Sequence, residues 1–259
     1  MNNWNPPPPT DDFSAAWCNA NPAATSVMEA ISFATPIMES FLIRTVADSL
    51  PGQHDEAMAA RCKAFIVDEK NHTRVHHKLN AALLGHLGEA PPALPLLRKL
   101  FGAARRHLSL PNRLLLVAAL EHSTAVMSMG YLKREARWRF GSPFARELFA
   151  LHAAEELAHC SAAFDLWVIE GTAGRIARTS AVLAIMAAGL VYASIAVPWI
   201  LYRKSGRRLT ATLTGMAGFA AAGWRDVDLG STLGELFSFA RADYHPDQLI
   251  AAGMSGAAL

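Results

Sequence analysis

Apolar residues recur with a helical period along almost the whole chain from about residue 22 onward. No segment shows the apolar–polar alternation that marks a half-buried strand. We therefore expect an all-α protein, and a chain of 259 residues is long enough to bury a large core. Prolines and turn-forming pairs divide the pattern into helices expected at about residues 26–50, 55–87, 112–139 and 143–170.

The boundaries of these helices carry local signals. Ser26 and Glu29 have the spacing of a capping box, which predicts the start of the first helix. Gly88 is placed to end the second helix, and Ser142 is placed to cap the fourth. Several prolines in residues 88–111 predict a long connector with at most one short helix.

The two ends of the chain differ from this helical middle. Residues 1–20 hold four consecutive prolines and predict a disordered, extended arm rather than a signal peptide. Residues 179–202 carry no charge, would form a helix about 36 Å long, and precede a milder apolar run at 209–224. We therefore expect a bundle over residues 21–174 and an apolar helical hairpin with C-terminal helices over residues 175–259.

The uncharged run has two interpretations. It is longer than the roughly 30 Å hydrocarbon core requires, and basic residues flank both of its ends. This favours membrane contact through 179–202, as a re-entrant hairpin or an interfacial helix on the cytoplasmic side. The alternative is a cytoplasmic protein in which this helix packs on the bundle.

Composition excludes several classes of function. A formal net charge of +2 is too small for a surface that tracks phosphates, so we expect no nucleic-acid partner. The three cysteines have no CxxC spacing, which argues against a disulfide framework and a thiolate zinc site. We expect Cys160, which follows a candidate ligand, to point away from it.

Two Glu-x-x-His motifs carry the chemistry. They are Glu69-Lys-Asn-His72 and Glu156-Leu-Ala-His159, and on a helix the two side chains of each motif lie on one face. A lone glutamate precedes each motif, Glu39 before the first and Glu121 before the second. The separation matches the distance along the chain from the middle of one helix to the middle of the next helix in a hairpin. This duplicated layout resembles the ferritin-like four-helix bundle with one long crossover, whose facing helices hold two metal ions.

The charge balance agrees with two metal ions. Glu121 lies among apolar residues, where an ionised carboxylate is costly unless it is paired or binds metal. Four carboxylates neutralise two divalent ions, and carboxylate with imidazole suits Fe, or Mn with Fe, better than structural zinc. The alternative is that these residues are solvated charges on amphipathic helices.

Other polar residues share these helix faces. His76 and His152 each lie one turn from a motif and are either a seventh ligand or a group that orients a carboxylate. We expect Glu155 to form an ion pair or to orient a ligand, and His122 to be a hydrogen-bonded core histidine. No catalytic side chain is indicated beyond the metal site.

The runs at 68–80, 119–125 and 152–167 resemble the bacterial family of predicted metal-dependent hydrolases. The resemblance extends from about residue 21 to about residue 248, and it implies a metal-dependent hydrolase. One departure is Thr35-Pro36-Ile37-Met38-Glu39, where the family pattern has a glycine before the glutamate. The spacing of His152, Glu156 and His159 also resembles that of the arylamine N-oxygenases, in which the added histidine is a metal ligand.

Three functions remain open at this point. The ligand pattern favours an enzyme that activates O2 and oxidises a small hydrophobic substrate. The family resemblance favours a two-metal hydrolase, in which a nearby Glu or His acts as general base. The third is a bundle that binds metal without catalysis. The oligomeric state is also open, with a homodimer as one alternative.

Overall fold

The computed structural model describes residues 4–52, 55–133, 138–226 and 229–256. Within these ranges every regular secondary-structure element is a helix, and the β structure is limited to one isolated bridge between Cys18 and Phe140. This confirms the all-α fold class. The helices are α1 (Pro22–Ser49), α2 (Glu56–Leu87), α3 (Leu94–His107), α4 (Leu110–Leu132), α5 (Pro143–Glu170), α6 (Arg175–Lys204), α7 (Leu209–Asp226), α8 (Leu229–Ser238) and α9 (Pro246–Gly256), with a short 3-10 turn at Leu50–Gly52.

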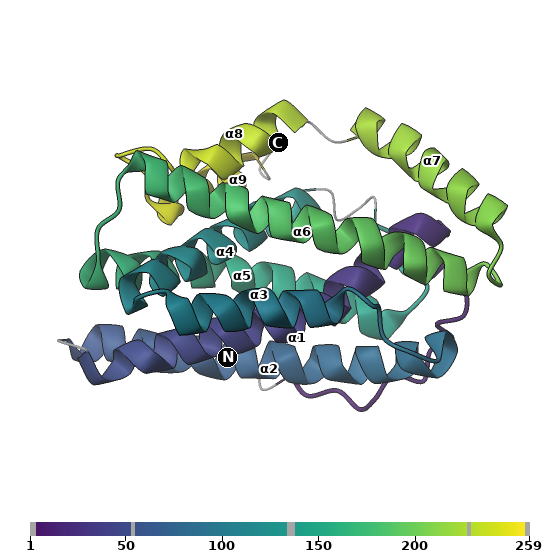
Figure 1. Cartoon of the computed structure of the whole chain (residues 1–259), viewed down its shortest axis with the longest axis horizontal. Helices are drawn as coiled ribbons and strands as arrows, with labels where there is room; N and C mark the ends of the chain where they lie inside the picture. Colours follow the sequence, from purple (N-terminus) through teal and green to yellow (C-terminus); the bar gives the residue numbers. More distant parts are fainter. Residues whose placement is uncertain (1–3, 53–54, 134–137, 227–228, 257–259) are drawn as a thin grey trace.

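Two helical hairpins make a bundle (Figure 1). Helix α1 packs along α2, and α4 packs along α5, and these two pairs share the most extensive contacts. Contacts of α2 with α5 and of α1 with α4 close the four helices around two clusters of buried apolar side chains. The four main helices expected from the sequence therefore correspond to α1, α2, α4 and α5.

The helix ends are set by nearby side chains. Asn21 caps α1 by accepting two backbone N–H groups of its first turn, so the helix begins at Pro22. Asp55 caps α2 in the same way, and Gly88 ends it with a left-handed φ of 79°. Ser142 accepts a backbone N–H at the start of α5, as the sequence predicts.

The predicted capping box at Ser26 and Glu29 was wrong, because both residues lie inside α1. The Ser26 hydroxyl donates to the Pro22 carbonyl at 2.9 Å. The buried Glu29 carboxylate accepts from Trp17 Nε1 at 2.8 Å and from Lys204 Nζ at 2.5 Å. Glu29 therefore joins the N-terminal arm, α1 and the end of α6.

The N-terminal arm departs from the expected disorder on both sides of its proline run, and before the run Lys78 Nζ donates to Asn5 Oδ1 at 2.7 Å. Phe13, Trp17 and Cys18 are buried against the bundle. The Gly141 N–H donates to the Trp17 carbonyl at 2.6 Å, and the Trp17 ring stacks on Phe149. The proline run predicts an extended backbone, but the aromatic residues that follow it bury enough apolar surface to fix this part of the arm.

The connector between the hairpins contains α3, which spans about 21 Å at 1.5 Å per residue. Leu94 and Leu97 are buried where α3 packs on α1 and α6. Helix α3 is thus the single short helix that the proline-rich connector allows. The next helix, α4, ends at Leu132, and its expected continuation to Arg139 includes residues 134–137, which lie outside the described residues.

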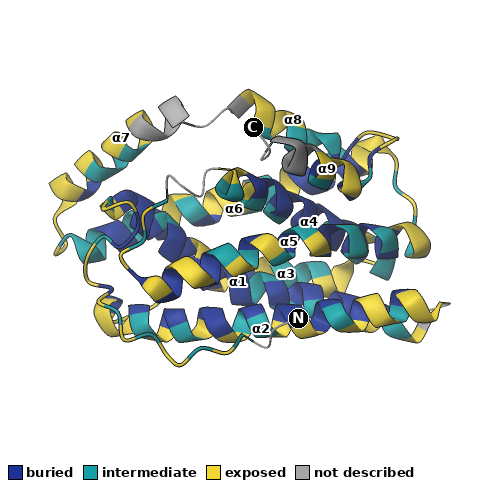
Figure 2. Cartoon of the chain, turned by 180° about the vertical axis from the view of Figure 1, so that it is seen from behind, coloured by how far each residue is buried: buried dark blue, intermediate teal, exposed yellow. Residues whose placement is uncertain are grey.

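Helix α6 lies along α1 and α4 and presents two different faces. Tyr192, Ala196 and Ile200 are buried, whereas Leu183 and Leu190 are half or more exposed. By length and composition, α1, α4 and α6 are each apolar enough to cross a membrane. The most apolar windows of α1 and α4 are 61% and 72% buried, against 28% for α6, and α7 is likewise mainly exposed (Figure 2).

The C-terminal helices α8 and α9 cover one end of the α4–α5 hairpin. Arg178 of α6 lies under this cover with its guanidinium 5.0 Å from the centroid of the Phe239 ring and 5.9 Å from that of Tyr244. The Tyr244 hydroxyl donates to His122 Nδ1 at 2.6 Å, while His122 Nε2 donates to the Leu236 carbonyl at 3.0 Å. His122 is therefore the hydrogen-bonded core histidine that the sequence predicts.

Candidate metal centre

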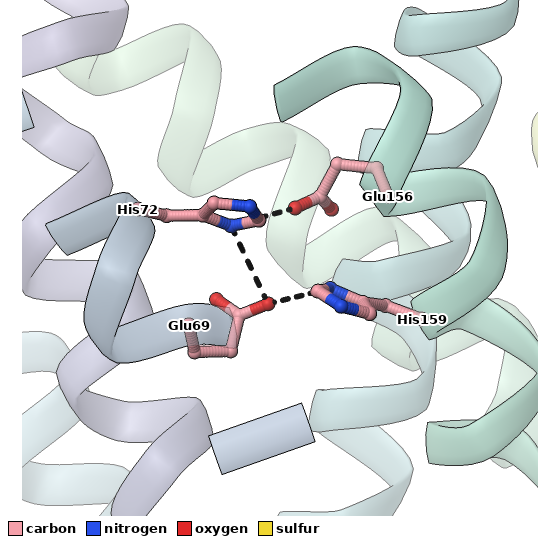
Figure 3. Close-up of side chains that lie close together, drawn as sticks. All are labelled: Glu69, His72, Glu156 and His159. Atoms are coloured by element: carbon pink, nitrogen blue, oxygen red, sulfur yellow. Dashed lines mark ion pairs between the residues drawn. The ribbon is translucent and has the colours of Figure 1, made fainter. Parts of the chain in front are cut away.

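The two Glu-x-x-His motifs face each other inside the bundle. Glu69 and His72 project from α2, and Glu156 and His159 project from α5 (Figure 3). All four side chains are buried, and one ligand atom from each lies within 4.8 Å of all the others. The spacing of three residues places each carboxylate and imidazole on one helix face, and the packing of α2 on α5 brings the two faces together.

The ligand atoms have the spacing of groups that share a metal ion. Glu69 Oε1 lies 2.8 Å from His159 Nδ1 and 3.8 Å from His72 Nδ1. His72 Nδ1 is also 3.7 Å from Glu156 Oε1. Ligands bound at about 2.1 Å around one ion lie about 3–4 Å apart. Glu69 is therefore placed to reach ions on both imidazole sides.

The two lone glutamates join this cluster from the other hairpin helices. Glu39 Oε1 of α1 lies 3.8 Å from His72 Nδ1. Glu39, His72 and His152 form a second group, in which one ligand atom from each residue lies within 4.8 Å of the others. Glu121 of α4 is fully buried and interacts electrostatically with both Glu69 and Glu156. Five of the six predicted core ligands thus belong to these two groups, and Glu121 is connected with them through its electrostatic interaction alone.

Many of these atoms have no hydrogen-bond partner among the residues that the structure describes. The set comprises Glu39 Oε1, both oxygens of Glu69, both oxygens of Glu121, His72 Nδ1 and His159 Nδ1. Glu69 Oε1 and His159 Nδ1 are close, but they are not aligned for a hydrogen bond. Buried polar atoms are normally paired. Apart from the Glu69–His159 pair, these carboxylate oxygens and imidazole nitrogens face one another with no hydrogen-bond partner in the described chain, and divalent metal ions fit as their common partner.

Acidic residues outside the cluster orient the two imidazoles. His72 Nε2 donates to Glu155 at 2.6 Å, and His159 Nε2 lies 3.4 Å from Asp68 Oδ2. With the Nε2 proton held outward, each Nδ1 faces the centre as a ligand atom. Glu155 has the orienting role that the sequence left open for it. Asp68 was missed, although an acidic residue directly before each Glu-x-x-His motif was a visible signal.

Two threonines that sequence reasoning missed fix two of the carboxylates. The Thr73 hydroxyl donates to Glu39 Oε2, and the Thr124 hydroxyl donates to Glu156 Oε2, the latter at 2.6 Å. Within the described chain, Glu69 and Glu121 have no such hydrogen bond. Single threonines carry no distinctive sequence signal, so only the packing of the helices reveals these contacts.

His152 and His76 continue from the cluster towards α1. His152 Nε2 lies 2.9 Å from Glu156 Oε1, and His152 Nδ1 lies 2.9 Å from His76 Nε2. The other nitrogen of His76 hydrogen-bonds to the Ser32 hydroxyl at 2.9 Å, and Ser32 donates to Asn80. His152 is thus close enough to be a further ligand. Both nitrogens of His76 are engaged outside the cluster, which suits the orienting role.

The environment of the cluster shifts the pKa values of its glutamates in opposite directions. Burial raises the pKa of Glu39, Glu69 and Glu121, and repulsion among the carboxylates adds to the effect. Burial also acts against ionisation of Glu156, but His152 and the other imidazoles outweigh it and lower the pKa of Glu156 to about 2. A buried group of carboxylates with raised pKa values is typical of a functional site.

The pKa of His159 is raised to about 11. Burial alone would lower it, but the contacts with Asp68 and Glu69 stabilise the imidazolium more strongly. In the metal-free protein a proton on His159 therefore balances part of the carboxylate charge. A metal ion that takes up His159 Nδ1 must displace that proton, so metal affinity depends on pH.

One side of the centre is near solvent. A small cavity of about 20 Å³ lies beside His72, His152 and Glu155, with Leu148 and Leu151 among its walls. This is room for about one water molecule. Cys160 is buried and its thiol donates to the Leu157 carbonyl, but burial and the charges of Glu121 and Glu156 raise the pKa of the thiol, so, contrary to the sequence prediction, it is not remote from these carboxylates.

Comparison with known proteins agrees with this centre. The family model for predicted metal-dependent hydrolases matches residues 8–249, which include every residue of the cluster. Comparisons with curated proteins and with solved structures give no match. Because the family model covers nearly the whole chain, the protein belongs to the family of predicted metal-dependent hydrolases.

Proposed function

We propose that this protein is a two-metal oxidoreductase that uses O2 to oxidise a small hydrophobic substrate. The observation that carries the proposal is the ligand set itself. Two Glu-x-x-His motifs face each other between two further buried glutamates, and the six side chains come from four helices. This donor set suits two iron ions, or one manganese and one iron. Such ions supply one-electron chemistry and O2 reduction when they are bound.

Two of the carboxylates accept a hydrogen bond from a threonine and two do not. This difference is compatible with metal ions that change oxidation state. Threonines hold Glu39 and Glu156 in one orientation. Glu69 and Glu121 have no such hydroxyl donor in the described chain, so bound metal ions would be the main partners that fix the orientation of their carboxylates. Ligands that are oriented mainly by the metal ions accommodate successive oxidation states, whereas a centre of fixed charge does not need them.

The surroundings of the centre support an apolar substrate. The cavity beside His72 has a mixed lining, with Trp4, Val75, Leu148 and Leu151 as its apolar part and Asn71, His72, His152 and Glu155 as its polar part. It has room for about one water molecule, so the chain keeps bulk water from the buried carboxylates. A larger substrate requires the side chains at this cavity to move. Asp68 and Glu155 meanwhile keep both imidazoles oriented towards the centre.

The same proposal places the protein at the cytoplasmic side of a membrane. Leu183 and Leu190 of α6 and Leu209 and Leu213 of α7 expose half or more of their surface. Arg175 at the start of α6 and Arg207 and Arg208 after its end are exposed and can contact anionic headgroups, whereas Arg178 and Lys204 are engaged inside the protein. Contact through this apolar face would bring the protein to the phase in which a hydrophobic substrate dissolves.

Hydrolysis is the second candidate, and the family description favours it. The two metals would then act as Lewis acids, and no change of oxidation state would be needed. Glu155 and His152 lie beside the cavity, where either is placed to accept a proton from water. A hydrolase of this kind stays active with zinc, whereas the oxidoreductase does not.

The deciding experiment is metal reconstitution. The purified chain is stripped with chelator and loaded anaerobically with Fe(II), with Mn(II) plus Fe(II), or with Zn(II). We expect about two ions per chain, with O2 uptake in the iron-containing forms and none in the zinc form. Esterase or phosphatase activity of the zinc form without O2 uptake by the iron form would assign hydrolysis. Glu147→Ala, an exposed change on α5, is the matched control for losses caused by Glu121→Ala.

A further inference from the structure

A groove separate from the metal centre lies between α1, α2 and α3. Its volume is about 520 Å³, within the range of about 300–1,000 Å³ that is usual for small-molecule sites. Helix α3 runs alongside α1 on the outside of the bundle (Figure 1), so the groove is on the outer side of the α1–α2 hairpin. Ser40 of α1 lines this groove, whereas its neighbour Glu39 joins the metal centre.

The floor of the groove is apolar. Phe33, Pro36 and Phe41 of α1 contribute to it, and Leu94 and Phe101 contribute from α3. The Phe41 and Phe101 rings lie 5.2 Å apart and hold the two helices together along its base. These side chains offer a length of hydrocarbon surface suited to an alkyl chain.

The rim of the groove is cationic. Arg44, Arg98 and Arg105 line it, and its described lining includes no aspartate or glutamate. Arg105 has one loose ion pair, at 3.6 Å to Asp48, and Asp48 is already bound by Arg113 at 2.5 Å. In the described part of the chain, neither Arg44 nor Arg98 has an ion-pair partner. Positive charge is thus concentrated beside an apolar floor, and Asp48, which is shared with Arg113, neutralises only part of it among the described residues.

The alignment of α1 with α3 places two of the three arginines at the same end of the groove. Phe41 pairs with Phe101, and Asp48 pairs with Arg105, so α1 and α3 run in the same direction. Arg44 lies between Phe41 and Asp48 on α1, and it therefore shares that end of the groove with Arg105. An anionic headgroup at this end leaves the apolar floor for the chain attached to it.

We propose that this groove binds one long-chain amphiphile with an anionic headgroup, of the free fatty-carboxylate type. The charge complementarity and the apolar floor together select this class over a neutral or cationic amphiphile. The site does not depend on the metal ions. Its test and that of the proposed oxidase function can therefore fail separately.

The first test is calorimetric titration of the full chain with laurate below its critical micelle concentration. Dodecanol and dodecyltrimethylammonium serve as neutral and cationic probes with the same chain length. We expect one laurate per chain and binding about tenfold tighter than for either control probe. Equal affinity for the three probes, or binding of several copies with no saturation at one, would overturn the proposal.

Two sets of variants locate the binding. Arg44→Gln, at the headgroup end of the groove, is expected to weaken laurate binding about fivefold, and Arg98→Gln, farther along the rim, about twofold. Lys99→Gln is the matched control, because Lys99 is exposed on the same helix but does not line the groove. It should leave the affinity unchanged. Equal losses in Lys99→Gln and Arg98→Gln would show general charge attraction and contradict a defined site.

A variant that adds a side chain inside the groove tests whether the ligand occupies its apolar floor. Gly102 lines the groove, and a Cβ built there approaches only the far end of Arg106, at 3.9 Å. Gly102→Leu should therefore occupy groove space and reduce laurate binding at least tenfold. Gly130→Leu on α4, where a Cβ also meets open space, is the control that should bind normally. If Gly102→Leu does not fold by circular dichroism, the exposed arginine variants still decide the outcome.

A last experiment distinguishes binding of a free amphiphile from binding of a membrane surface. Phosphatidylcholine vesicles with and without phosphatidylglycerol are sedimented with the wild type and with Arg44→Gln and Arg98→Gln. The proposal expects vesicle binding to be the same in the arginine variants. If the variants lose vesicle binding while laurate fails to bind the wild type, the groove is a membrane contact, and the proposal is wrong.

Discussion

The α1–α2 and α4–α5 hairpins contribute the same kinds of residue to the metal centre, but their surroundings differ. Each supplies a lone glutamate and a Glu-x-x-His motif, and each motif's preceding acid orients the histidine of the other hairpin. Glu155 is 39% exposed at its side chain, whereas that of Asp68 is 5% exposed. The sequence duplication therefore gives a symmetric ligand set with one solvent-near side and one closed side.

The closed side is shielded from solvent by the C-terminal segment. Tyr244 and Phe239 cover His122, the neighbour of Glu121, beneath α8 and α9. On the other side, a small cavity reaches His72 and His152. Under the proposed function, substrate and O2 would approach from the His72 side. The following predictions test this difference in order of decreasing effect.

The largest effect is expected from Glu69→Ala, because Glu69 lies near both imidazoles. Metal content measured by mass spectrometry should fall from about two ions per chain to almost none. Glu147→Ala, an exposed change on α5, should retain both ions. If Glu69→Ala keeps one full equivalent of metal, Glu69 does not serve both sides.

The two orienting acids should differ in strength. Asp68→Asn is expected to weaken metal binding about 100-fold and Glu155→Gln about tenfold, since such outer contacts are typically worth 10–100-fold. Water can replace the half-exposed Glu155 but not the buried Asp68. Competition with a coloured chelator measures both affinities. Equal losses of metal affinity in the two variants would contradict the distinction between a solvent-near side at Glu155 and a closed side at Asp68.

Glu121→Gln should stabilise the metal-free protein while weakening metal binding. The pKa of Glu121 is raised well above its ordinary value of 4.5, mainly by burial, so its ionised form is disfavoured in the folded state. The metal-free wild type therefore loses stability as the pH rises above about 4.5, and the variant escapes this loss. We expect a gain of about 1–3 kcal/mol at pH 8 in urea unfolding with chelator, and almost none at pH 4. Glu39→Gln should gain less, because Thr73 already donates to Glu39. A loss of stability at pH 8 would contradict this account.

The smallest effect is expected from the threonines. Thr124→Val removes the donor to Glu156 and should lower metal affinity about fivefold, the equivalent of about 1 kcal/mol. Two ions should still bind. Thr124→Ser, which keeps the hydroxyl, is the control and should restore the affinity. A Thr124→Val protein with wild-type affinity would show that the packing of α4 on α5 alone fixes Glu156.

Much of the fold and of the ligand set could be predicted from local pattern. Helical periodicity and turn residues located α1, α2, α4 and α5, because these signals act within a few residues. The failures came where a distant segment changes the role of a residue. Glu29 looked like a capping residue until Lys204 was brought beside it, and Trp17 looked like part of a mobile arm until Phe149 met its ring.

The sequence by itself determined which residues can bind metal, because a spacing of three fixes one helix face wherever the helix lies. Only the tertiary structure decided which acid orients which histidine, since Asp68 acts on α5 and Glu155 acts on α2. It also decided that one side of the centre is covered by the C-terminal helices. Contacts between helices depend on packing along their whole length, and no local pattern contains that information.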